Sequence, residues 1–235
     1  MDLPAQVEKG LEKFLDAART AFGVNLVSVV LYGSGAEGKL RPTSDVNLIA
    51  VVDSAGEAQM TAVGPVVTML RAAIELKVMF LRRAEIDDAV IAFPVKFADI
   101  RRRRRVLLGE DVFAGMTIPR SALIARLRQV LLNLIVRARE SYAERVGQED
   151  HLVAMVADLA GPLRSAAASL LDLENTPAAS AKEALEKVGG TRRAVAELSE
   201  AREKQSLPPG EAAAAVFSLL EVAEEMLARL SRVAA

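Results

Sequence analysis

The chain has 235 residues, of which 51% are hydrophobic and only 4% are aromatic, and it contains no cysteine. This length allows two cores of ordinary domain size, and the lack of cysteine excludes disulfide frameworks and cysteine-based zinc sites. Thirty Lys and Arg against 31 Asp and Glu give a net charge of -1, which excludes a globally basic nucleic-acid-binding protein. No basic, apolar leader follows Met1 and no apolar run reaches about 18 residues, so we expect a cytoplasmic protein without a membrane span.

The first part of the chain alternates helical and extended patterns. Residues 5–22 carry apolar side chains at helical spacing, which predicts a covering helix. Residues 25–32, 46–52 and 76–81 are short apolar runs, which predict strands, and the run over 25–32 is typical of a strand covered on both faces.

Two further helices are expected beside these strands. Asp53 and Ser54 predict the cap of a helix over residues 56–73, which we expect to be broken or delayed near Gly64-Pro65. Residues 83–91 predict a second helix, which the Phe93-Pro94 pair interrupts.

The second part of the chain changes to long amphipathic patterns separated by Gly- and Pro-containing turns. The predicted helices cover residues 120–146, 150–173, 180–188, 191–204 and 210–233. Because short loops make consecutive helices antiparallel neighbours, we expect an up-and-down helical bundle. The domains are predicted at 1–116 and 117–235.

The stretch from Val29 to Val52 contains the most informative motif. A buried strand ends at Gly33-Ser34, and a second buried strand follows Asp45. A glycine-rich turn that opens a short helix offers backbone N–H groups and a helix dipole, which together suit a phosphate group. The carboxylate of Asp45 could then hold a divalent cation against that phosphate.

Gly33-Ser34, followed by Ser44-Asp45 and by Asn47, resembles the signature of the nucleotidyltransferase superfamily, which includes the aminoglycoside and minimal nucleotidyltransferases. The resemblance covers roughly residues 24–115. It implies an α/β (α+β) domain with a small mixed sheet, followed by an all-α domain. In that family Gly-Ser seats the triphosphate, and an Asp-x-Asp pair with a third carboxylate on a later strand binds two Mg²⁺ ions.

The sequence departs from the family pattern at three positions. Asn47 replaces the second aspartate of the metal pair, and an amide oxygen brings no charge to a metal ion. Glu37 stands where active relatives commonly have a basic residue. Lys77 lies in the third strand, where an acid is expected, and either neutralises bound phosphate or pairs with Glu75.

These comparisons assign candidate roles. Gly33, Ser34, Ser44 and Lys77 are candidates for nucleotide binding. Asp45 and Asn47 share one face because they are two residues apart on a strand, so both are candidate metal and catalytic residues. Asp45 could instead only cap the glycine turn.

Glu75 is the candidate general base. The resemblance implies ATP or another nucleoside triphosphate as ligand, Mg²⁺ as cofactor, and transfer of a nucleoside monophosphate to an unknown acceptor with release of pyrophosphate. The three departures favour an alternative, a pseudo-enzyme that senses nucleotide or acts as a scaffold. Such a scaffold would form a homo-oligomer through its helical domain.

Five consecutive arginines, Arg101 to Arg105, form the most basic segment of the chain. They could bind nucleic-acid phosphates, but no aromatic residues are interleaved with them as in a single-strand stacking surface. The favoured interpretation is a helix surface whose arginines pair with acids, namely Asp87, Asp88, Asp99, Glu110 or Asp111. The only histidine, His151, is expected to be a solvated surface residue.

Overall fold

The chain forms two compact units, Met1–Ile118 and Pro119–Ala235. The computed structural model describes residues 3–38, 40, 44–189, 193–204 and 206–233. Each unit has its own apolar core, so each is described by itself.

The first unit is built on a mixed sheet in the order β3-β2-β1-β4. The strands are β1 (Leu26–Tyr32), β2 (Val46–Val52), β3 (Leu76–Arg82) and β4 (Arg104–Gly109). β1 is antiparallel to both of its neighbours, whereas β2 and β3 are parallel and are connected through a helix, as a parallel pair requires. This arrangement confirms the predicted small mixed sheet.

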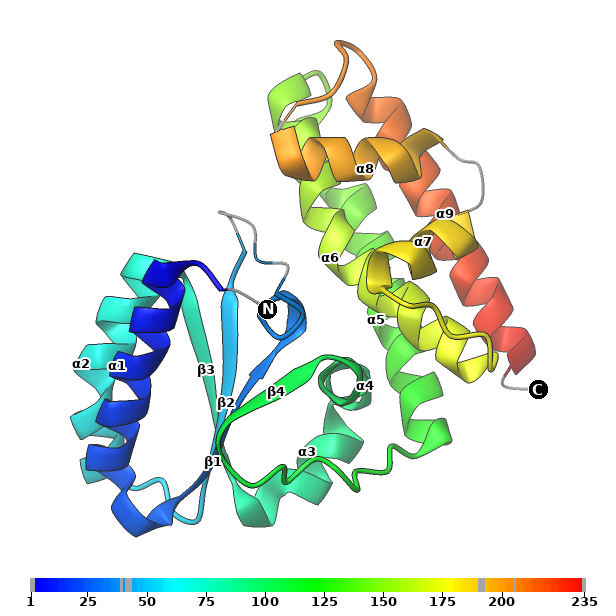
Figure 1. Cartoon of the computed structure of the whole chain (residues 1–235). Helices are drawn as coiled ribbons and strands as arrows, with labels where there is room; N and C mark the ends of the chain where they lie inside the picture. Colours follow the sequence, from blue (N-terminus) through cyan, green and yellow to red (C-terminus); the bar gives the residue numbers. More distant parts are fainter. Residues whose placement is uncertain (1–2, 39, 41–43, 190–192, 205, 234–235) are drawn as a thin grey trace. The chain divides into compact units, whose positions relative to one another are not determined.

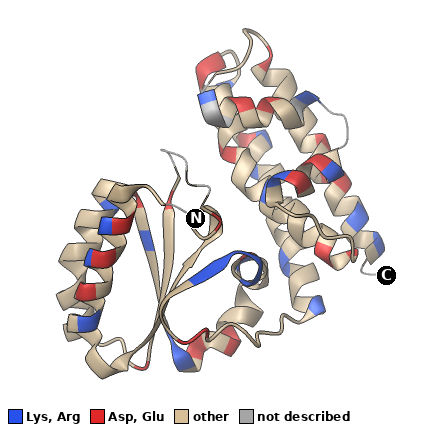
Figure 2. Ribbon diagram, viewed as in Figure 1, with Lys and Arg blue, Asp and Glu red and all other residues tan. Residues whose placement is uncertain are grey.

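Helices cover both faces of this sheet (Figure 1). One face packs against α1 (Ala5–Phe22) and α2 (Glu57–Ile74), and the other against α3 (Ile86–Ala92) and α4 (Pro94–Arg102). Single-turn 3-10 helices, η1 (Gly23–Asn25), η2 (Gly33–Gly35) and η3 (Arg83–Glu85), complete the connections. Figure 2 shows acidic and basic residues along α1, as expected of a covering helix.

Alternation along the strands divides the core into two layers. Val29 and Leu31 of β1 pack with α1, where Phe14 is fully buried. Val30, one residue away on the same strand, joins the opposite layer with Phe97 of α4. Successive side chains of a strand point to opposite faces, so both faces of a doubly covered strand must be apolar.

Three local expectations are corrected. The helix after β2 is capped at Gly56, whose N–H donates to the Gln59 side chain at 2.9 Å, rather than by Asp53 and Ser54. The same helix continues through Pro65, because the Thr61 carbonyl that loses its helical donor lies on the exposed side. The end of the arginine run is a strand, β4, that the sequence did not predict.

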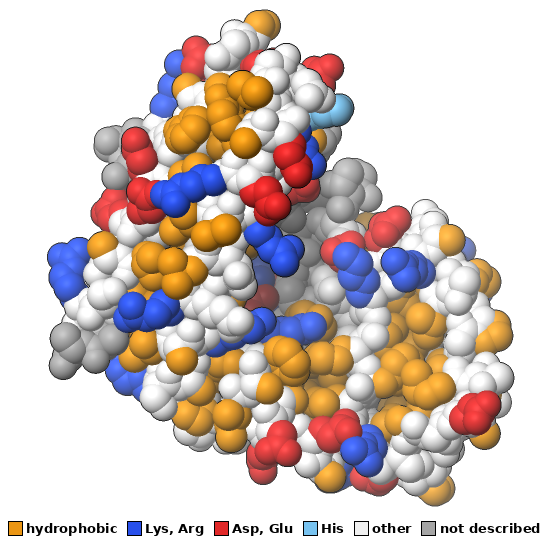
Figure 3. All heavy atoms as spheres, turned by 180° about the vertical axis from the view of Figure 1, so that it is seen from behind, with side chains coloured by type: hydrophobic (Ala, Val, Ile, Leu, Met, Phe, Trp, Pro, Cys, Tyr) orange, Lys and Arg blue, Asp and Glu red, His pale blue; other side chains and the backbone are white. Residues whose placement is uncertain are grey.

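The second unit consists, in its described part, of helices α5 (Arg120–Arg145), α6 (Glu149–Leu173), α7 (Ala181–Gly189), α8 (Arg193–Lys204) and α9 (Ala212–Val233). The long helices α5, α6 and α9 pack on one another, and α7 and α8 pack on α6. The helical composition confirms the predicted all-α region. Figure 3 shows groups of hydrophobic side chains on one face of this unit. Among the described helices, none is long and apolar enough to cross a membrane.

Candidate functional site

One end of the sheet brings together most of the residues that the sequence singled out. β1 ends there, while β2, β3 and β4 begin there, because β1 runs antiparallel to its neighbours. Lys77 is the direct register partner of Asn47, Asn47 of Tyr32, and Tyr32 of Arg104. Directly paired residues project from the same face, so these four side chains form a row across the sheet on the side of α3 and α4.

The glycine turn, residues 33–38, follows this row directly. Gly33 has φ 75°, a left-handed conformation that glycine adopts without steric cost. Its N–H donates to the Arg103 carbonyl at 3.0 Å, and the Ala36 N–H donates to the Gly33 carbonyl at 3.1 Å. The expectation that the turn offers its backbone N–H groups to a phosphate is therefore wrong for Gly33, whose N–H extends the β1–β4 pairing.

Ser34 occupies the first turn of η2, where backbone N–H groups have no acceptor within the helix. Its side chain is half-buried, and its hydroxyl has no partner among the residues that the structure describes. Ser44 is also half-buried and stands directly before Asp45. The Ser34 hydroxyl can therefore still form a hydrogen bond with a ligand.

Asp45, Asn47, Glu75 and Lys77 lie at the adjoining ends of β2 and β3, and we call them the Lys77 corner. The Lys77 ammonium lies 2.8 Å from Asp45 Oδ2, with side-chain exposures of 57% and 41%. Asn47 donates from Nδ2 to the Asp45 carbonyl at 3.3 Å. The ion-pair partner of Lys77 is therefore Asp45 rather than Glu75, and the Asp45 carboxylate binds this ammonium instead of capping the glycine turn.

Glu75 joins α2 to β3 in a strained backbone conformation. Its φ of 51° and ψ of 39° are left-handed, and its carbonyl accepts the Val46 N–H at 3.3 Å. Glycine is the usual residue at such a helix end, because a side chain there is sterically unfavourable. The Glu75 side chain is exposed and has no partner among the described residues. The free carboxylate of Glu75 therefore lies two residues before Lys77 in the sequence.

These residues do not form a conventional metal site. Among the described residues, no group of three His, Cys, Asp or Glu side chains could hold a metal ion. At the Lys77 corner, Asp45 already neutralises an ammonium and Asn47 is uncharged. Mg²⁺ prefers charged oxygen ligands in an octahedron, so this donor set does not fit the two-metal arrangement that the resemblance implies.

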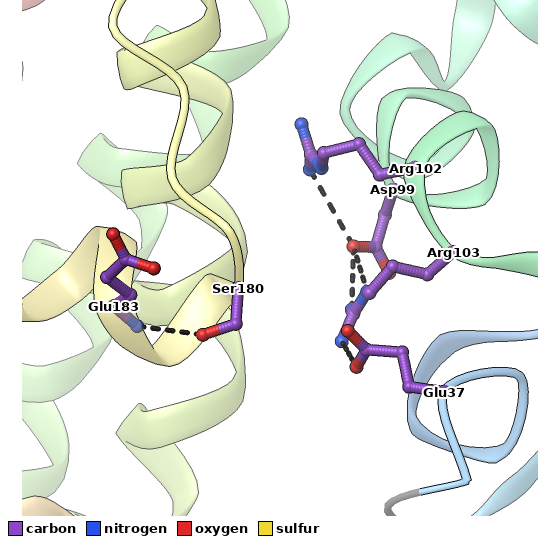
Figure 4. Close-up of polar contacts among 6 residues, drawn as sticks. All are labelled: Glu37, Asp99, Arg102, Arg103, Ser180 and Glu183. Atoms are coloured by element: carbon purple, nitrogen blue, oxygen red, sulfur yellow. Dashed lines mark hydrogen bonds and ion pairs between the residues drawn. The ribbon is translucent and has the colours of Figure 1, made fainter. Parts of the chain in front are cut away.

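A second charged group lies on the other side of the glycine turn, and we call Glu37, Asp99, Arg102 and Arg103 the Arg103 cluster (Figure 4). Arg103 Nε donates to Asp99 Oδ1 at 2.9 Å, and its Nη1 donates to Glu37 Oε2 at 3.3 Å. Arg102 lies 3.6 Å from Asp99. Burial lowers the pKa of Arg103, but Asp99 and Glu37 outweigh it and hold that pKa above its ordinary value.

The arginine run is thus divided between two elements and is largely paired with acids. Arg101 and Arg102 end α4, whereas Arg104 begins β4 and pairs with Asp111 at 2.8 Å. Asp99 and Asp111 are partners that the favoured interpretation named. The expectation of one helix surface was wrong, because the chain turns at Arg103.

Tyr32 and Lys96 are site residues that the sequence did not reveal. The Lys96 ammonium lies 5.8 Å from the centre of the Tyr32 ring, within the range of a cation–π interaction. Burial, followed by the charges of Asp99 and Asp45, raises the pKa of Tyr32 to about 12. Burial also lowers the pKa of Lys96. The position of Tyr32 directly before Gly33 was the one available signal, since Lys96 reaches it only through folding.

Comparison with known proteins supports the fold assignment. No protein-family model and no curated protein matches the sequence. The structure is similar to that of spectinomycin adenyltransferase AAD(9) from Enterococcus faecialis, determined with ATP and spectinomycin, with a TM-score of 0.63 and 12% identity over 95% of this chain and 99% of that chain. The chain therefore has the fold of a nucleotidyltransferase.

Proposed function

We propose that this protein binds a nucleoside triphosphate at the glycine turn, and that it transfers nucleoside monophosphate very slowly. The proposal is carried by one arrangement, in which Gly33-Ser34 ends β1 and Asp45 precedes the neighbouring strand β2. The similar adenyltransferase structure contains ATP, which supports a nucleotide as the ligand.

In the proposed complex, the Ser34 hydroxyl and the first N–H groups of η2 hold phosphate oxygens. Lys77 projects from β3, and Lys96 reaches Tyr32 from α4, which covers the same face of the sheet; both supply positive charge. Because Asn47 is neutral and Asp45 is engaged by Lys77, the charge that two metal ions would place on the phosphates is missing. Slow transfer follows from this loss.

Residual transfer would use Glu75 as the general base. Its carboxylate would take the proton of an acceptor hydroxyl, whose oxygen attacks the α-phosphorus. The bond from that phosphorus to the bridging oxygen of the β-phosphate breaks, and pyrophosphate leaves. The left-handed strain at Glu75 supports a functional role, because a residue without a side chain would be more stable there.

The test measures ATP binding by calorimetry and pyrophosphate release with hydroxyl-bearing acceptors. We expect ATP binding that is weakened at least tenfold by Ser34→Ala, with pyrophosphate release close to background. Glu75→Gln should leave ATP binding unchanged and remove any residual release. Absence of ATP binding would overturn the proposal, as would release at the rate of an efficient enzyme.

A scaffold is the second candidate function, in which the helical unit forms a homo-oligomer. It is supported by exposed apolar side chains on α5 and α9, with exposures of 45% for Leu132, 59% for Val136 and 48% for Phe217. Light scattering after gel filtration tests this candidate. A dimer that Val136→Glu converts to a monomer would support it, and a monomeric wild-type protein would exclude it.

A further inference from the structure

Lys77 pairs with an acid and lies in the row of residues that crosses the sheet beside the glycine turn. Val46 pairs with Leu76 and Asn47 with Lys77, so Asp45 is the diagonal neighbour of Lys77 on the same face. The ammonium lies 2.8 Å from Asp45 Oδ2. The carboxylate that would be the first ligand of a metal ion therefore already has a cation against it.

This ammonium retains the capacity to bind an anion. A lysine ammonium has three N–H donors, and a single hydrogen bond, to Asp45, is shown for it. Its side chain is 57% exposed, so water or a ligand oxygen can reach the remaining donors. An ammonium that contacts both a carboxylate and a phosphate would supply positive charge as a metal ion does, but one charge instead of two.

A divalent ion and this ammonium would compete for the same place. A metal ion bound to Asp45 Oδ2 would lie close to Nζ, and two cations that share one carboxylate oxygen repel each other. Asn47 adds no negative charge that could hold both. The two substitutions relative to the family pattern therefore act in the same direction, since one removes an acid and the other adds a base.

We infer that the Lys77 ammonium replaces the divalent cation at this site, so that the chain binds a nucleoside triphosphate without Mg²⁺. This inference rests on the proposed nucleotide site. In this inference the Lys77 side chain supplies the positive charge that balances the phosphates. Substituting both Asn47 and Lys77 should therefore restore a dependence of ATP binding on Mg²⁺.

The experiment measures the affinity for ATP by calorimetry in excess EDTA and in excess Mg²⁺. For the wild-type protein, we expect dissociation constants within about threefold of each other in the two conditions. Lys77→Thr should weaken binding at least tenfold in EDTA, whereas Lys77→Arg, which keeps the charge, should retain it. Lys13→Thr is the matched control, because Lys13 is an exposed lysine on α1, and it should bind ATP as the wild type does.

The double variant Asn47→Asp with Lys77→Thr tests the exchange directly. It has two carboxylates and lacks the ammonium, so Mg²⁺ should tighten its ATP binding at least tenfold over EDTA. Wild-type binding in Mg²⁺ but not in EDTA would overturn the inference while leaving the nucleotide site intact. Failure to bind in either condition would instead overturn the nucleotide site, and with it the inference.

Discussion

The Lys77 corner and the Arg103 cluster neutralise acids on either side of the glycine turn in different ways. Asp45 and Lys77 are 41% and 57% exposed and share a single contact. Asp99 and Arg103 are 15% and 21% exposed, and the guanidinium contacts both carboxylate oxygens. An exposed point charge can exchange its partner for a ligand, whereas a half-buried guanidinium held at several positions cannot.

This difference suggests that the Arg103 cluster serves mainly stability and the Lys77 corner mainly binding. The backbone carbonyl of Arg103 accepts the Gly33 N–H, and the Arg103 side chain donates to Glu37. Arg103 therefore holds the glycine turn both at its first residue and near its end. No comparable anchor among the described contacts joins the turn to Lys77. We therefore expect substitutions in the Arg103 cluster to change stability most, and substitutions in the Lys77 corner to change it least.

Arg103→Ala should have the largest effect, a loss of about 2 to 3 kcal/mol in the free energy of unfolding. The change leaves Asp99 half-buried with only the 3.6 Å contact to Arg102. Urea denaturation measures the loss. Arg101→Ala is the matched control from the same arginine run, because Arg101 is exposed, and it should change stability by less than about 0.5 kcal/mol. Equal effects of the two substitutions would contradict a structural role for the cluster.

Tyr32 lies between the two groups, and its buried phenol predicts a loss of stability at alkaline pH. Its pKa is raised to about 12 from an ordinary value of 10.0, chiefly by burial and then by Asp99 and Asp45. The unfolded chain releases this proton above pH 10, whereas the folded chain keeps it until about pH 12. Stability from Tyr32 is therefore complete below pH 10 and is lost as the pH rises towards 12, by about 2 to 3 kcal/mol.

The measurement is the free energy of unfolding between pH 9 and about 12 for the wild-type protein and for Tyr32→Phe. The variant should lose stability less steeply over this range, because lysine deprotonation is common to both proteins and cancels in the difference. Below pH 9 the two curves should run parallel. Identical slopes above pH 10 would show that the phenol is not protected in the folded state.

Three of the four strands could be predicted from the sequence, because each is a short apolar run that a local pattern reveals. The apolar runs ending at Tyr32 and starting at Val46 need covers on both faces, and the covering helix over 5–22 was predicted with its observed ends. β4 was missed because it begins with Arg104 and Arg105, which leaves an apolar run too short to predict a strand. Its identity as a strand comes only from pairing with β1.

The candidate site was only partly predictable for a related reason. Gly33, Ser34, Asp45 and Asn47 are close in sequence, so a motif could identify them. The pairing of Lys77 with Asp45 depends on the parallel register of β2 and β3, which no local pattern fixes. Glu75 is adjacent in sequence to β3, but it does not pair with Lys77; it takes a left-handed backbone conformation at the end of α2.

Lys77→Ala should have the smallest effect on stability, below about 0.5 kcal/mol. An ion pair with both side chains this exposed gains little Coulomb energy and costs side-chain entropy. A double-mutant cycle with Asp45→Ala, followed by urea denaturation in low and high salt, isolates the coupling between the two residues. A coupling above about 1.5 kcal/mol would mean that Asp45 and Lys77 form a structural pair like Asp99 and Arg103. A weak, salt-sensitive coupling would instead mean that an anion can take the place of Asp45 at the ammonium for little loss of folding free energy.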